Sequence, residues 1–464
     1  MATVLGANTL SSGGYQVDNS CRFNGDAYVH KAVVAGNQRT FTYSFWTKRS
    51  TLNGYQTFIG YAQSAGGGGS TNRGELIFVG DGDDTLRVGF NPGASSWSNY
   101  TMNTGVFRDT SAWYNIVLKL NTTNGTASER LKIFVNGVSQ GLDGYPGQNF
   151  DTGFNVDGYV YHVGRSASGT GNFLKGYLAE AVFIDGTALD ADSFGEFDED
   201  SGIWKPIDVS GLTFGNNGFH LDFEASGNLG NDANGGTDFT EVSLAATDQF
   251  TDTCTNNFAT MNPLDNFRAA HTFAEGNTKV STSTSTTSFS TSTIGLSTGK
   301  WYFEGTVRAV MGEEGIGVSP VVSSAADDYP GKATDSVSYK GNNGNVRKSN
   351  SNAGYGDAYV NNNVIGVILN LDDNEIKFSL NGTVQNSGTA VALTAAASTP
   401  NGVYFPMVGD GSTDSVGVWE VNFGAGSFTA LSSAVADENG FGAFEYAPPS
   451  GFLAICTKNL AESG

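Results

Sequence analysis

The sequence has few of the features that stabilise secreted or membrane-bound proteins. Only three of its 464 residues are cysteines, Cys21, Cys254 and Cys456, and they lie far apart with no metal-binding spacing. This scarcity argues against a disulfide-built domain and favours folding in a reducing cytoplasm. The first residues lack the basic and apolar regions of a signal peptide, and no run approaches the roughly 18 apolar residues of a membrane-spanning helix. We therefore expect neither a leader nor a membrane partner.

Basic residues are also scarce. The chain has 24 Lys and Arg against 46 Asp and Glu, which leaves a formal net charge of −22. A surface this acidic repels phosphate backbones, so we expect no nucleic-acid partner. The simpler interpretation of the charge is solubility, for example in salty surroundings, and the alternative is an acidic recognition surface.

Helical periodicity is nearly absent. The one helix candidate is the short segment Leu189 to Phe197, in which Leu189, Phe194 and Phe197 are apolar. By contrast, 63 glycines, 31 phenylalanines and 18 tyrosines, with only 10 prolines, are typical of many short strands joined by tight turns. We therefore predict an all-β protein with very little helix.

Two segments far apart in the chain alternate as strands with one apolar face do. They are "GKWYFEGTV", residues 299–307, and "FTYSFWTKRS", residues 41–50. Because 464 residues are long for one core, two domains of about 200 residues each are expected. The sequence therefore predicts two antiparallel β-sandwiches.

Each half of the chain also repeats one local plan. A strand, a polar turn and an alternating strand lead to Asn136-Gly137 in the first half and to Asn381-Gly382 in the second. An Asn-Gly pair favours a tight hairpin turn with positive φ at both positions. We interpret the repetition as two related sandwiches, although similar hairpins could also arise independently.

The composition along the chain predicts four parts. A first sandwich covers residues 1–225, and a polar, Gly- and Asn-rich connection covers residues 226–254. A second sandwich covers residues 255–445, and a C-terminal tail covers residues 446–464. The Ser- and Thr-rich segment 281–293 is either a low-complexity linker or, as its Thr content favours, an exposed pair of edge strands.

Five segments of the second half, in their order along the chain, resemble a SPRY domain. They are "GKWYFEGTV", "GIGVS", "SVSYKGNNG", "GDAYVNNNVIGVILNLDDNEIKFSLNG" and "YFPMV…VNFG". The first half resembles a laminin-G or concanavalin-A-like jelly-roll sandwich, in the segments "FTYSFWTKRS", "WYNIVLKL", "LKIFVNG" and "GYLAEAVFIDGTAL". The two resemblances together cover about 400 of the 464 residues.

This pairing is similar to large virion proteins of bacteriophages, which also show "SCRFNGDAYVHK", "TDTCTNNFATMNPLDN" and a closing "PPSGFLAICTKNL". The resemblance implies a non-enzymatic virion structural protein, assembled in the host cytoplasm and associated with the tail or a fibre. Its implied partners are other virion proteins and a host-surface polysaccharide. A homo-oligomer is expected, with a trimer favoured. The alternative is a capsid-decorating or purely structural virion component, and a polysaccharide-degrading enzyme on the same fold is the least favoured interpretation.

The motifs that suggest catalysis stand in the wrong context. "GVSQG", residues 137–141, has the spacing of a nucleophile elbow around Ser139, but it follows an Asn-Gly hairpin turn and no helix can follow it. The four histidines form no ligand-spaced pair, and adjacent acidic residues lie in turn-like segments. We therefore expect no enzymatic activity and no cofactor.

Function in a sandwich is expected on its loops, because inward side chains fill the core. Aromatic side chains in polar loops stack on sugar faces, or they anchor the loops that carry them. The candidates for ligand binding are Trp97, Tyr100, Tyr329, Tyr339 and Tyr355.

An acidic loop is the one candidate metal site. "VGDGDDT", residues 79–85, brings Asp81, Asp83 and Asp84 together between two strand-like segments. Three carboxylates could help to hold Ca²⁺, which takes six to eight oxygen ligands. The alternative is a plain Gly/Asp hairpin turn.

The last apolar stretch is the candidate for contact between subunits. Phe452, Leu453 and Ile455 follow a Pro-Pro break at residues 448–449. Such a tail packs back on its own domain by default, or it docks on a neighbouring subunit, as the resemblance to virion proteins favours.

Overall fold

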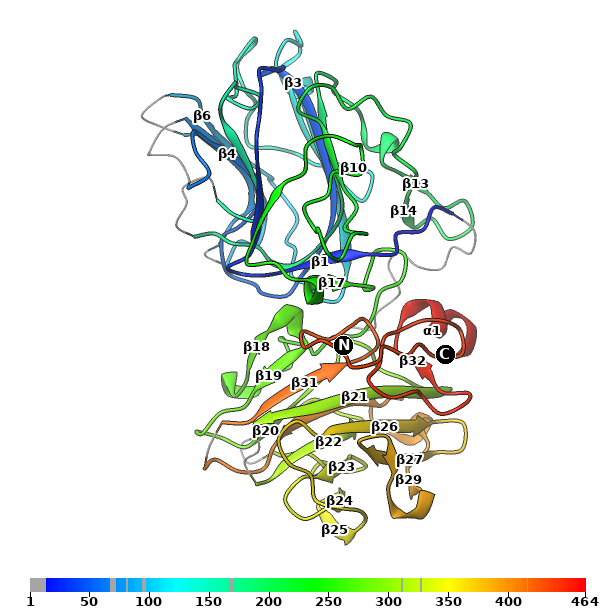
Figure 1. Cartoon of the computed structure of the whole chain (residues 1–464). Helices are drawn as coiled ribbons and strands as arrows, with labels where there is room; N and C mark the ends of the chain where they lie inside the picture. Colours follow the sequence, from blue (N-terminus) through cyan, green and yellow to red (C-terminus); the bar gives the residue numbers. More distant parts are fainter. Residues whose placement is uncertain are drawn as a thin grey trace. The chain divides into compact units, whose positions relative to one another are not determined.

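The computed structural model describes residues 14–66, 72–80, 82–93, 97–166, 171–309, 312–325, 328–414 and 416–464 (Figure 1). The chain divides into two compact units, and the division falls between Thr255 and Asn256. Of the described residues, 14–255 belong to the first unit, and the second unit covers those of Asn256–Gly464. In both units the described residues form antiparallel sheets, so the all-β prediction is confirmed. Over these residues, no helix has both the length and the apolar character needed to cross a membrane.

Two large sheets form the sandwich of the first unit. The eight-stranded sheet has the order β10-β9-β8-β3-β12-β1-β17, with β15 paired to β12. Its strands are β1 (Ser20–Asn24), β3 (Thr40–Arg49), β8 (Trp113–Asn121), β9 (Leu131–Val135), β10 (Val138–Ser139), β12 (Lys175–Asp185), β15 (Phe219–Leu221) and β17 (Gln249–Phe250). The seven-stranded sheet has the order β16-β2-β11-β4-β5-β6-β7. Its strands are β2 (Tyr28–Ala32), β4 (Gln56–Ala62), β5 (Arg73–Phe78), β6 (Leu86–Asn91), β7 (Ser98–Thr101), β11 (Val160–Val163) and β16 (Thr240–Val242).

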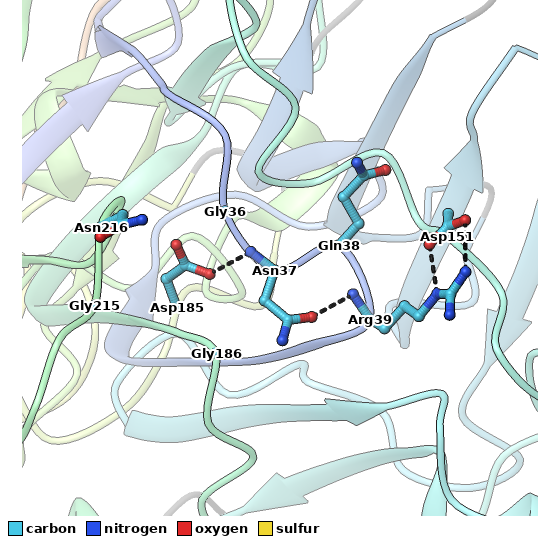
Figure 2. Close-up of a pocket in the computed structure, with 9 residues that line it drawn as sticks. All are labelled: Gly36, Asn37, Gln38, Arg39, Asp151, Asp185, Gly186, Gly215 and Asn216. Carbon is cyan, nitrogen blue, oxygen red and sulfur yellow. Dashed lines mark hydrogen bonds and ion pairs between the residues drawn. The ribbon is translucent and has the colours of Figure 1, made fainter.

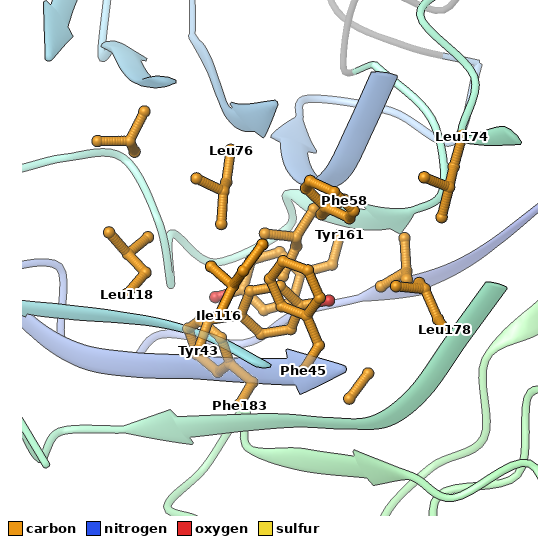
Figure 3. Close-up of a cluster of buried hydrophobic side chains, with 14 of the residues drawn as sticks. Tyr43, Phe45, Phe58, Leu76, Ile116, Leu118, Tyr161, Leu174, Leu178 and Phe183 are labelled. Carbon is orange, nitrogen blue, oxygen red and sulfur yellow. The ribbon is translucent and has the colours of Figure 1, made fainter. Parts of the chain in front are cut away.

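Aromatic side chains from both sheets form the core between them (Figure 3). Tyr43 and Phe45 of β3 point inward because side chains alternate along a strand, as the sequence predicts. The rings of Phe45 and Phe58 lie 4.5 Å apart between their centroids, and Phe58 meets Phe78 edge to face at 4.8 Å. Such contacts add to the burial of apolar area and hold the two sheets face to face.

Two sheets also build the second unit. The nine-stranded sheet has the order β18-β19-β31-β21-β26-β27-β28, with β29 on β27 and β32 on β21. Its strands are β18 (Thr272–Ala274), β19 (Lys279–Ser281), β21 (Lys300–Ala309), β26 (Val364–Asn370), β27 (Glu375–Leu380), β28 (Thr383–Val384), β29 (Val391–Ala392), β31 (Val418–Asn422) and β32 (Leu453–Ala454). The six-stranded sheet has the order β20-β30-β22-β23-β24-β25. Its strands are β20 (Ser288–Thr291), β22 (Glu314–Ser319), β23 (Val337–Lys340), β24 (Asn345–Lys348), β25 (Ser351–Gly354) and β30 (Phe405–Asp410).

The two units share one topology. In the first sheet of each unit, β10-β9-β8-β3-β12-β1 corresponds to β28-β27-β26-β21-β31-β19. In the second sheet, β2-β11-β4-β5-β6-β7 corresponds to β20-β30-β22-β23-β24-β25. The corresponding strands also follow one another in the same order along the chain. The repeated pattern read from the sequence therefore reflects a shared strand order.

The two predicted Asn-Gly hairpins occupy corresponding places. Asn136 and Gly137 have φ of 47° and 77°, and Asn381 and Gly382 have φ of 48° and 79°. These positive values suit Asn and Gly and let a two-residue turn match the twist of its strands.

Residues 186–255 and 424–464 close the two sandwiches; we call them the first and second closing segments. In the first unit, the buried carboxylate of Asp252 accepts hydrogen bonds from Lys48 Nζ at 2.7 Å and Trp113 Nε1 at 3.0 Å. These bonds fix the segment on the outer face of the eight-stranded sheet, because both donors come from strands of that sheet.

In the second unit, the carboxylate of Glu304 on β21 accepts hydrogen bonds from the backbone N–H groups of Glu445 at 2.8 Å and Tyr446 at 2.9 Å. Burial raises the pKa of Glu304 to about 7. The second closing segment is therefore fixed through its backbone, at a buried carboxyl group of the sheet that it covers.

The ends of each unit lie side by side. In the first unit, β1 pairs with β17, and Thr255 Oγ1 both accepts a hydrogen bond from Val17 N at 3.1 Å and donates one to Val17 O at 2.8 Å. In the second unit, Ala259 N donates to Ile455 O at 3.0 Å. We call these two sets of contacts the end clasps.

Two sequence expectations are corrected by these segments. Residues 226–254 are no connection, because they form β16 and β17 and bury Leu229 and Phe239 in the first core. The tail 446–464 is no separate part, because it forms β32 and the single described α-helix, α1 (Thr457–Ser463), within the second unit.

The predicted helix at Leu189 to Phe197 is wrong. Only one turn of 3-10 helix forms, at Ala191–Ser193, and β13 (Gly195–Phe197) follows and pairs with β14 (Trp204–Pro206). A segment this short gains little as an isolated helix, so pairing with β14 decides its conformation.

The Ser- and Thr-rich segment 281–293 forms strands, as its Thr content favours, but not an exposed pair. β19 ends at Ser281 and belongs to the nine-stranded sheet, whereas β20 belongs to the six-stranded sheet and is buried. The segment therefore crosses from one sheet to the other; its side chains are buried from Ser288 to Thr293, whereas Thr284 and Ser285 are exposed.

Candidate functional site

A pocket with a polar lining lies among loops at one end of the first unit, and we call it the rim pocket (Figure 2). Its volume is about 550 Å³. Loops that leave β2, β10 and β12, and the loop before β15, supply its walls. The lining residues are Gly36, Asn37, Gln38, Arg39, Asp151, Asp185, Gly186, Gly215 and Asn216.

A buried carboxylate holds the first of these loops. Asp185, at the end of β12, accepts a hydrogen bond from Asn37 N at 2.9 Å (Figure 2). The side-chain oxygen of Asn37 then accepts bonds from the backbone N–H groups of Arg39 and Thr40, each at 2.9 Å. An asparagine that bonds to its own following backbone sets a local turn, so the position of Arg39 depends on Asp185.

A second layer of buried amides supports the same loop. Asn217 accepts a bond from Val34 N at 2.9 Å and donates to Val34 O at 2.8 Å and to Asn155 Oδ1 at 3.0 Å. Asn155 in turn accepts a bond from Tyr161 OH at 2.6 Å and donates to Asn37 O at 2.8 Å. Burial raises the pKa of Tyr161 well above its ordinary value, so its hydroxyl stays a donor. The pocket wall is thus preorganised.

Two glycines are required where the chain passes close to Asp185. A Cβ on Gly36 would collide with the Asp185 carboxylate, and a Cβ on Gly215, where φ is +78°, would collide with the Asp185 backbone oxygen. The glycines therefore let two loops meet at one carboxylate.

The accessible charges of the rim pocket are an ion pair. Arg39 binds Asp151 in a forked arrangement, with Nε–Oδ1 at 2.6 Å and Nη2–Oδ2 at 3.1 Å (Figure 2). These hydrogen bonds lower the pKa of Asp151 and raise the pKa of Arg39, so both groups stay charged over the physiological range. Their side chains are 42% and 53% exposed, which leaves both open to a ligand.

Planar amides complete the lining. The Gln38 side chain forms no hydrogen bond to any residue that the structure describes, and the exposed Asn216 amide has one long bond to Ala35 O at 3.4 Å. Each amide offers two donors and one acceptor oxygen. Together with Arg39 and Asp151, they can bind a neutral, polyhydroxylated ligand through several hydrogen bonds at once.

None of the ligand-binding residues predicted from the sequence lines the rim pocket. Its residues come from four stretches between positions 36 and 216, which only the folded topology brings together. The available signal was the Asn- and Gly-rich turns at strand ends, such as "AGNQR" and "FGNNG". Such turns are common in β proteins, so the sequence pattern alone could not show which of them form a binding site.

The prediction of ligand binding is wrong for two of the five aromatic residues. Tyr339 is fully buried in the second core, and Tyr355 is 9% exposed beside it, with ring centroids 5.7 Å apart. Tyr355 OH accepts a hydrogen bond from Phe378 N at 3.1 Å. Both rings therefore anchor loops from inside the second unit, which was the alternative reading of these residues.

The other three aromatics are half-buried and do not come together. Tyr100 packs against the first core, near Phe90. Tyr329 lies against the guanidinium group of Arg347, 4.3 Å from its ring centroid. Trp97 lies on the outer face of the seven-stranded sheet, where it contacts Arg73.

The acidic loop forms a hairpin between β5 and β6, and its described carboxylates do not converge. Asp81 lies outside the described residues, and Asp83 is exposed. Asp84 is buried between Arg49 and Arg108, with N–O distances of 3.1 and 3.2 Å. Its carboxylate is therefore used by arginines, and the described part of the chain holds no group of three or more metal-ligating side chains.

The apolar tail packs inside its own unit. Ile455 is fully buried and Leu453 is 8% exposed, both in the second core, whereas Phe452 is half-buried. The prediction that Leu453 and Ile455 contact another subunit is thus wrong, because β32 adds to β21 and turns these side chains inward.

Ser139 lies where the sequence places it. It is exposed on β10, directly after the Asn136-Gly137 turn, and pairs with Phe134 of β9. No helix follows it, so the segment lacks the geometry of a nucleophile elbow.

Two family matches divide along the two units. Residues 23–193 match the concanavalin A-like lectin/glucanases superfamily, and residues 300–423 match the SPRY domain. Most of the rim pocket lies within the first match, but Gly215 and Asn216 lie beyond it. No curated protein matches the chain.

Solved structures with similar folds are distant. A heptameric pentraxin from Limulus polyphemus is 16% identical, with 37% of this chain and 78% of that chain covered and a TM-score of 0.28. A candidate carbohydrate binding protein from Bacteroides ovatus is 17% identical, with 50% and 61% covered and a TM-score of 0.34. The SPRY domain of human HERC1 is 14% identical, with 31% and 86% covered and a TM-score of 0.23.

Similarities this low carry no argument about ligands. Each family match lies within one of the two sandwiches, residues 23–193 in the first and residues 300–423 in the second. The protein therefore carries a concanavalin A-like lectin-type domain followed by a SPRY domain.

Proposed function

We propose that the protein binds saccharides through the rim pocket and catalyses no reaction on them. The observation that carries the proposal is the preorganised lining of the pocket, in which Gln38, Asn216 and the Arg39–Asp151 pair face a volume of about 550 Å³. Sugar hydroxyls both donate and accept hydrogen bonds, so planar amides beside a charged pair suit neighbouring hydroxyls of one ring. The match to a lectin-type superfamily supports the same ligand class.

The lining argues for binding without hydrolysis. Glycoside hydrolysis needs two carboxyl groups that flank one bond, and one of them acts as an acid. In the rim pocket Asp151 is exposed, but Asp185 is buried and accepts hydrogen bonds from the backbone of Asn37 and Asn217. The one accessible carboxylate, Asp151, is paired with Arg39, so the lining offers neither the acid nor the second carboxylate that hydrolysis needs.

The proposed setting is a bacteriophage particle. The pairing of the two domains and the segments quoted above support a tail- or fibre-associated virion protein that adheres to host-surface glycans. A capsid-decorating role is the alternative. Such a protein works in several copies, with a trimer favoured, because repeated weak sites raise avidity by roughly 10²–10⁴.

The binding proposal is tested with oligosaccharide arrays followed by calorimetry of the best neutral ligand. Gln38→Ala and Asn216→Ala are each expected to weaken its binding by about 3- to 10-fold, the worth of one or two hydrogen bonds. Gln140→Ala is the matched control, because that amide bonds only to Val138 O at the far edge of the eight-stranded sheet. Unchanged binding in both pocket variants would remove the rim pocket from the proposal.

The same samples test the absence of catalysis. Mass spectrometry of each bound oligosaccharide after long incubation is expected to show no cleavage, also for Ser139→Ala. Cleavage products that depend on this chain would overturn the non-enzymatic part. Mass spectrometry of purified particles tests the virion setting, which fails if the chain is absent from them.

A further inference from the structure

Two arginines project from the outer face of the seven-stranded sheet in the first unit. Arg73 lies on β5 and Arg87 on β6, and both are half-buried. Their strand neighbours Leu76, Leu86 and Val88 point into the core, so alternation turns the arginine side chains outward. This face is separate from the rim pocket, which contains neither strand.

An aromatic ring holds each guanidinium group. Arg73 lies 5.1 Å from the ring centroid of Trp97, and Arg87 lies 5.6 Å from that of Tyr55. Trp97 in turn lies over Gly89, where a Cβ would come within 2.8 Å of its ring. Stacking on a ring limits how an arginine can rotate, so its N–H groups are oriented before any ligand arrives.

Neither guanidinium group has a directly bonded partner in the part of the chain that the structure describes. Within the described chain, Arg73 and Arg87 form no hydrogen bond and no ion pair, although the protein carries a net charge of −22. Arg73 Nε is also shielded from solvent and has no acceptor there. An arginine head group without an acceptor loses hydrogen bonds that water would supply, so this arrangement favours a ligand that accepts them.

The nearest carboxylate does not fill this role. Glu75 lies between the two arginines along β5, but it forms no ion pair with either of them. Its Oε2 accepts a hydrogen bond from Ser166 Oγ at 2.7 Å, and burial raises its pKa. The charges of Arg87 and Arg73 act on this carboxyl group through space, and one carboxyl group beside two arginines leaves an excess of positive charge for a ligand.

In the second unit, an arginine on the corresponding strand is neutralised by an ion pair. Arg347 lies on β24, the strand that corresponds to β6, and it also stacks on an aromatic ring, that of Tyr329. There, however, Arg347 Nη2 contacts Glu313 Oε2 at 2.8 Å. In the first unit the stacked arginines have Glu75 nearby but form no such ion pair with it.

We propose that Arg73 and Arg87 form a second saccharide site, on the sheet face, which binds sugars that carry carboxylate or sulfate groups. The inference rests on the proposed saccharide binding by the first unit. A guanidinium group binds the paired oxygens of either anion through two parallel hydrogen bonds. Asn99, exposed and paired with Gly89 between the two arginines, adds donors for sugar hydroxyls.

The register sets the size of the ligand. Ile77, opposite Arg87, is four residues from Arg73 along β5. At about 3.3 Å per residue, the two arginines are anchored roughly 13 Å apart along the strands. A monosaccharide therefore reaches one arginine, whereas an oligosaccharide with repeated anionic groups reaches both.

The test measures binding of three hexasaccharides to the full-length protein: oligoguluronate for carboxylate, a carrageenan fragment for sulfate, and laminarihexaose as the neutral probe. At least one acidic probe is expected to bind more tightly than the neutral one, and more weakly as salt rises from about 50 to 500 mM. Arg73→Gln and Arg87→Gln are each expected to weaken acidic binding by roughly 10- to 100-fold, the worth of a charged hydrogen-bond pair.

Control variants separate this site from general charge and from the rim pocket. Lys132→Gln removes the same charge from β9 of the other sheet, where Lys132 contacts Glu129, and is expected to leave acidic binding unchanged. Gln38→Ala is expected to weaken the neutral probe only. Arg87→Lys keeps the charge without the fork and should recover part of the loss, and circular dichroism checks that each variant is folded.

Three results would overturn the inference. Acidic probes that bind no more tightly than laminarihexaose exclude it, and so does wild-type affinity in folded Arg73→Gln and Arg87→Gln; in either case saccharide binding by the rim pocket can still stand. If none of the saccharides binds, both this inference and the proposed function fail. Which acidic probe binds more tightly shows whether carboxylate or sulfate is the natural group.

Discussion

The two sandwiches share their strand order, yet corresponding positions serve different purposes. Arg87 on β6 and Arg347 on β24 both stack on an aromatic ring. The Arg347 side chain is 6% exposed and paired with Glu313, whereas Arg87 is half-buried and unpaired within the described chain. Topology therefore decides where an arginine projects, and one neighbouring acid decides whether its charge stabilises the fold or remains available to a ligand.

The closing segments differ in sequence between the two units, yet they cover corresponding hairpins in the same way. The ring of Trp204 packs on Gly137, and the ring of Tyr446 packs on Gly382. In each unit, an aromatic side chain of the closing segment covers the corresponding Asn-Gly hairpin. Both closing segments extend beyond the family matches, so the folded unit is larger than the matched domain.

The largest effect is expected from the second closing segment. Ile455→Ala should lower the free energy of unfolding of the second unit by about 2–5 kcal/mol, because it leaves a cavity in a fully buried site. Calorimetry of the full chain should show one transition shifted down and the other unchanged. Leu264→Ala, at a position 61% exposed in the same unit, is the control. A loss below about 1 kcal/mol would mean that the tail is dispensable for the core.

The matched hairpins allow a direct comparison of the two units. Gly137→Ala and Gly382→Ala should each cost about 2–3 kcal/mol, because positive φ strains alanine and its Cβ meets the covering ring. Gly158→Ala and Gly388→Ala have positive φ with open space around them, and should cost only about 1 kcal/mol. Thermal unfolding measures all four variants. Equal losses in the hairpin and control variants would show that the aromatic covers contribute nothing.

The two stacked arginines should differ in their effect on stability. Arg347→Gln is expected to cost about 2 kcal/mol, since it removes a mostly buried charge partner of Glu313. Arg87→Gln is expected to change stability by less than about 0.5 kcal/mol, because no described hydrogen bond or ion pair is lost. Urea unfolding of the full chain compares them. A loss at Arg87 as large as that at Arg347 would indicate a structural role for Arg87 and weaken the proposed sheet-face site.

A pH response of opposite sign is expected in the two units. Asp410 on β30 is buried, which raises its pKa to about 7, and its cross-strand neighbour Glu314 adds to the shift. The folded state therefore holds a proton that the unfolded state releases, and the second unit should lose about 1 kcal/mol as the pH rises from 6 to 8. Asp410→Asn should remove this part of the dependence, measured as the melting temperature at each pH.

The corresponding strand of the first unit carries a histidine in place of the acid. Burial lowers the pKa of His162 on β11 to about 4, below its ordinary value near 6.5. The unfolded state therefore binds the proton first, and this contribution to stability is lost as the pH falls from 6.5 to 4. A melting profile of His162→Gln that keeps the full acid sensitivity of the first unit would contradict this assignment.

The sequence predicted the elements that depend on local pattern. Alternation around Phe45 and Phe303 identified strands that form the two cores, and both Asn-Gly turns have the expected positive φ. Segments decided by tertiary contacts were not predictable in this way. Residues 226–254 look polar and glycine-rich, and only the burial of Leu229 and Phe239 makes them part of the first core.

The candidate sites show the same limit. Tyr339 and Tyr355 stand among Gly and Asn residues that suggest exposed loops, but the alternation of β23 turns Tyr339 inward, and Tyr355, directly after β25, packs against it. The rim pocket depends on a contact between Asn37 and Asp185, which are 148 positions apart in the chain. Of the predicted aromatics, Trp97 alone lies at a proposed site, and there it orients Arg73.

The end clasps have a mechanical consequence. Tension along the polypeptide reaches the first unit at Val17 and leaves it at Thr255, and these two residues are hydrogen-bonded to each other. The sandwich between them is a loop outside the direct path of the force, which stays folded while the clasp holds. In the second unit, the contact between Ala259 and Ile455 places the two ends in the same way. Under load, the clasps would therefore open before the loops of the rim pocket deform.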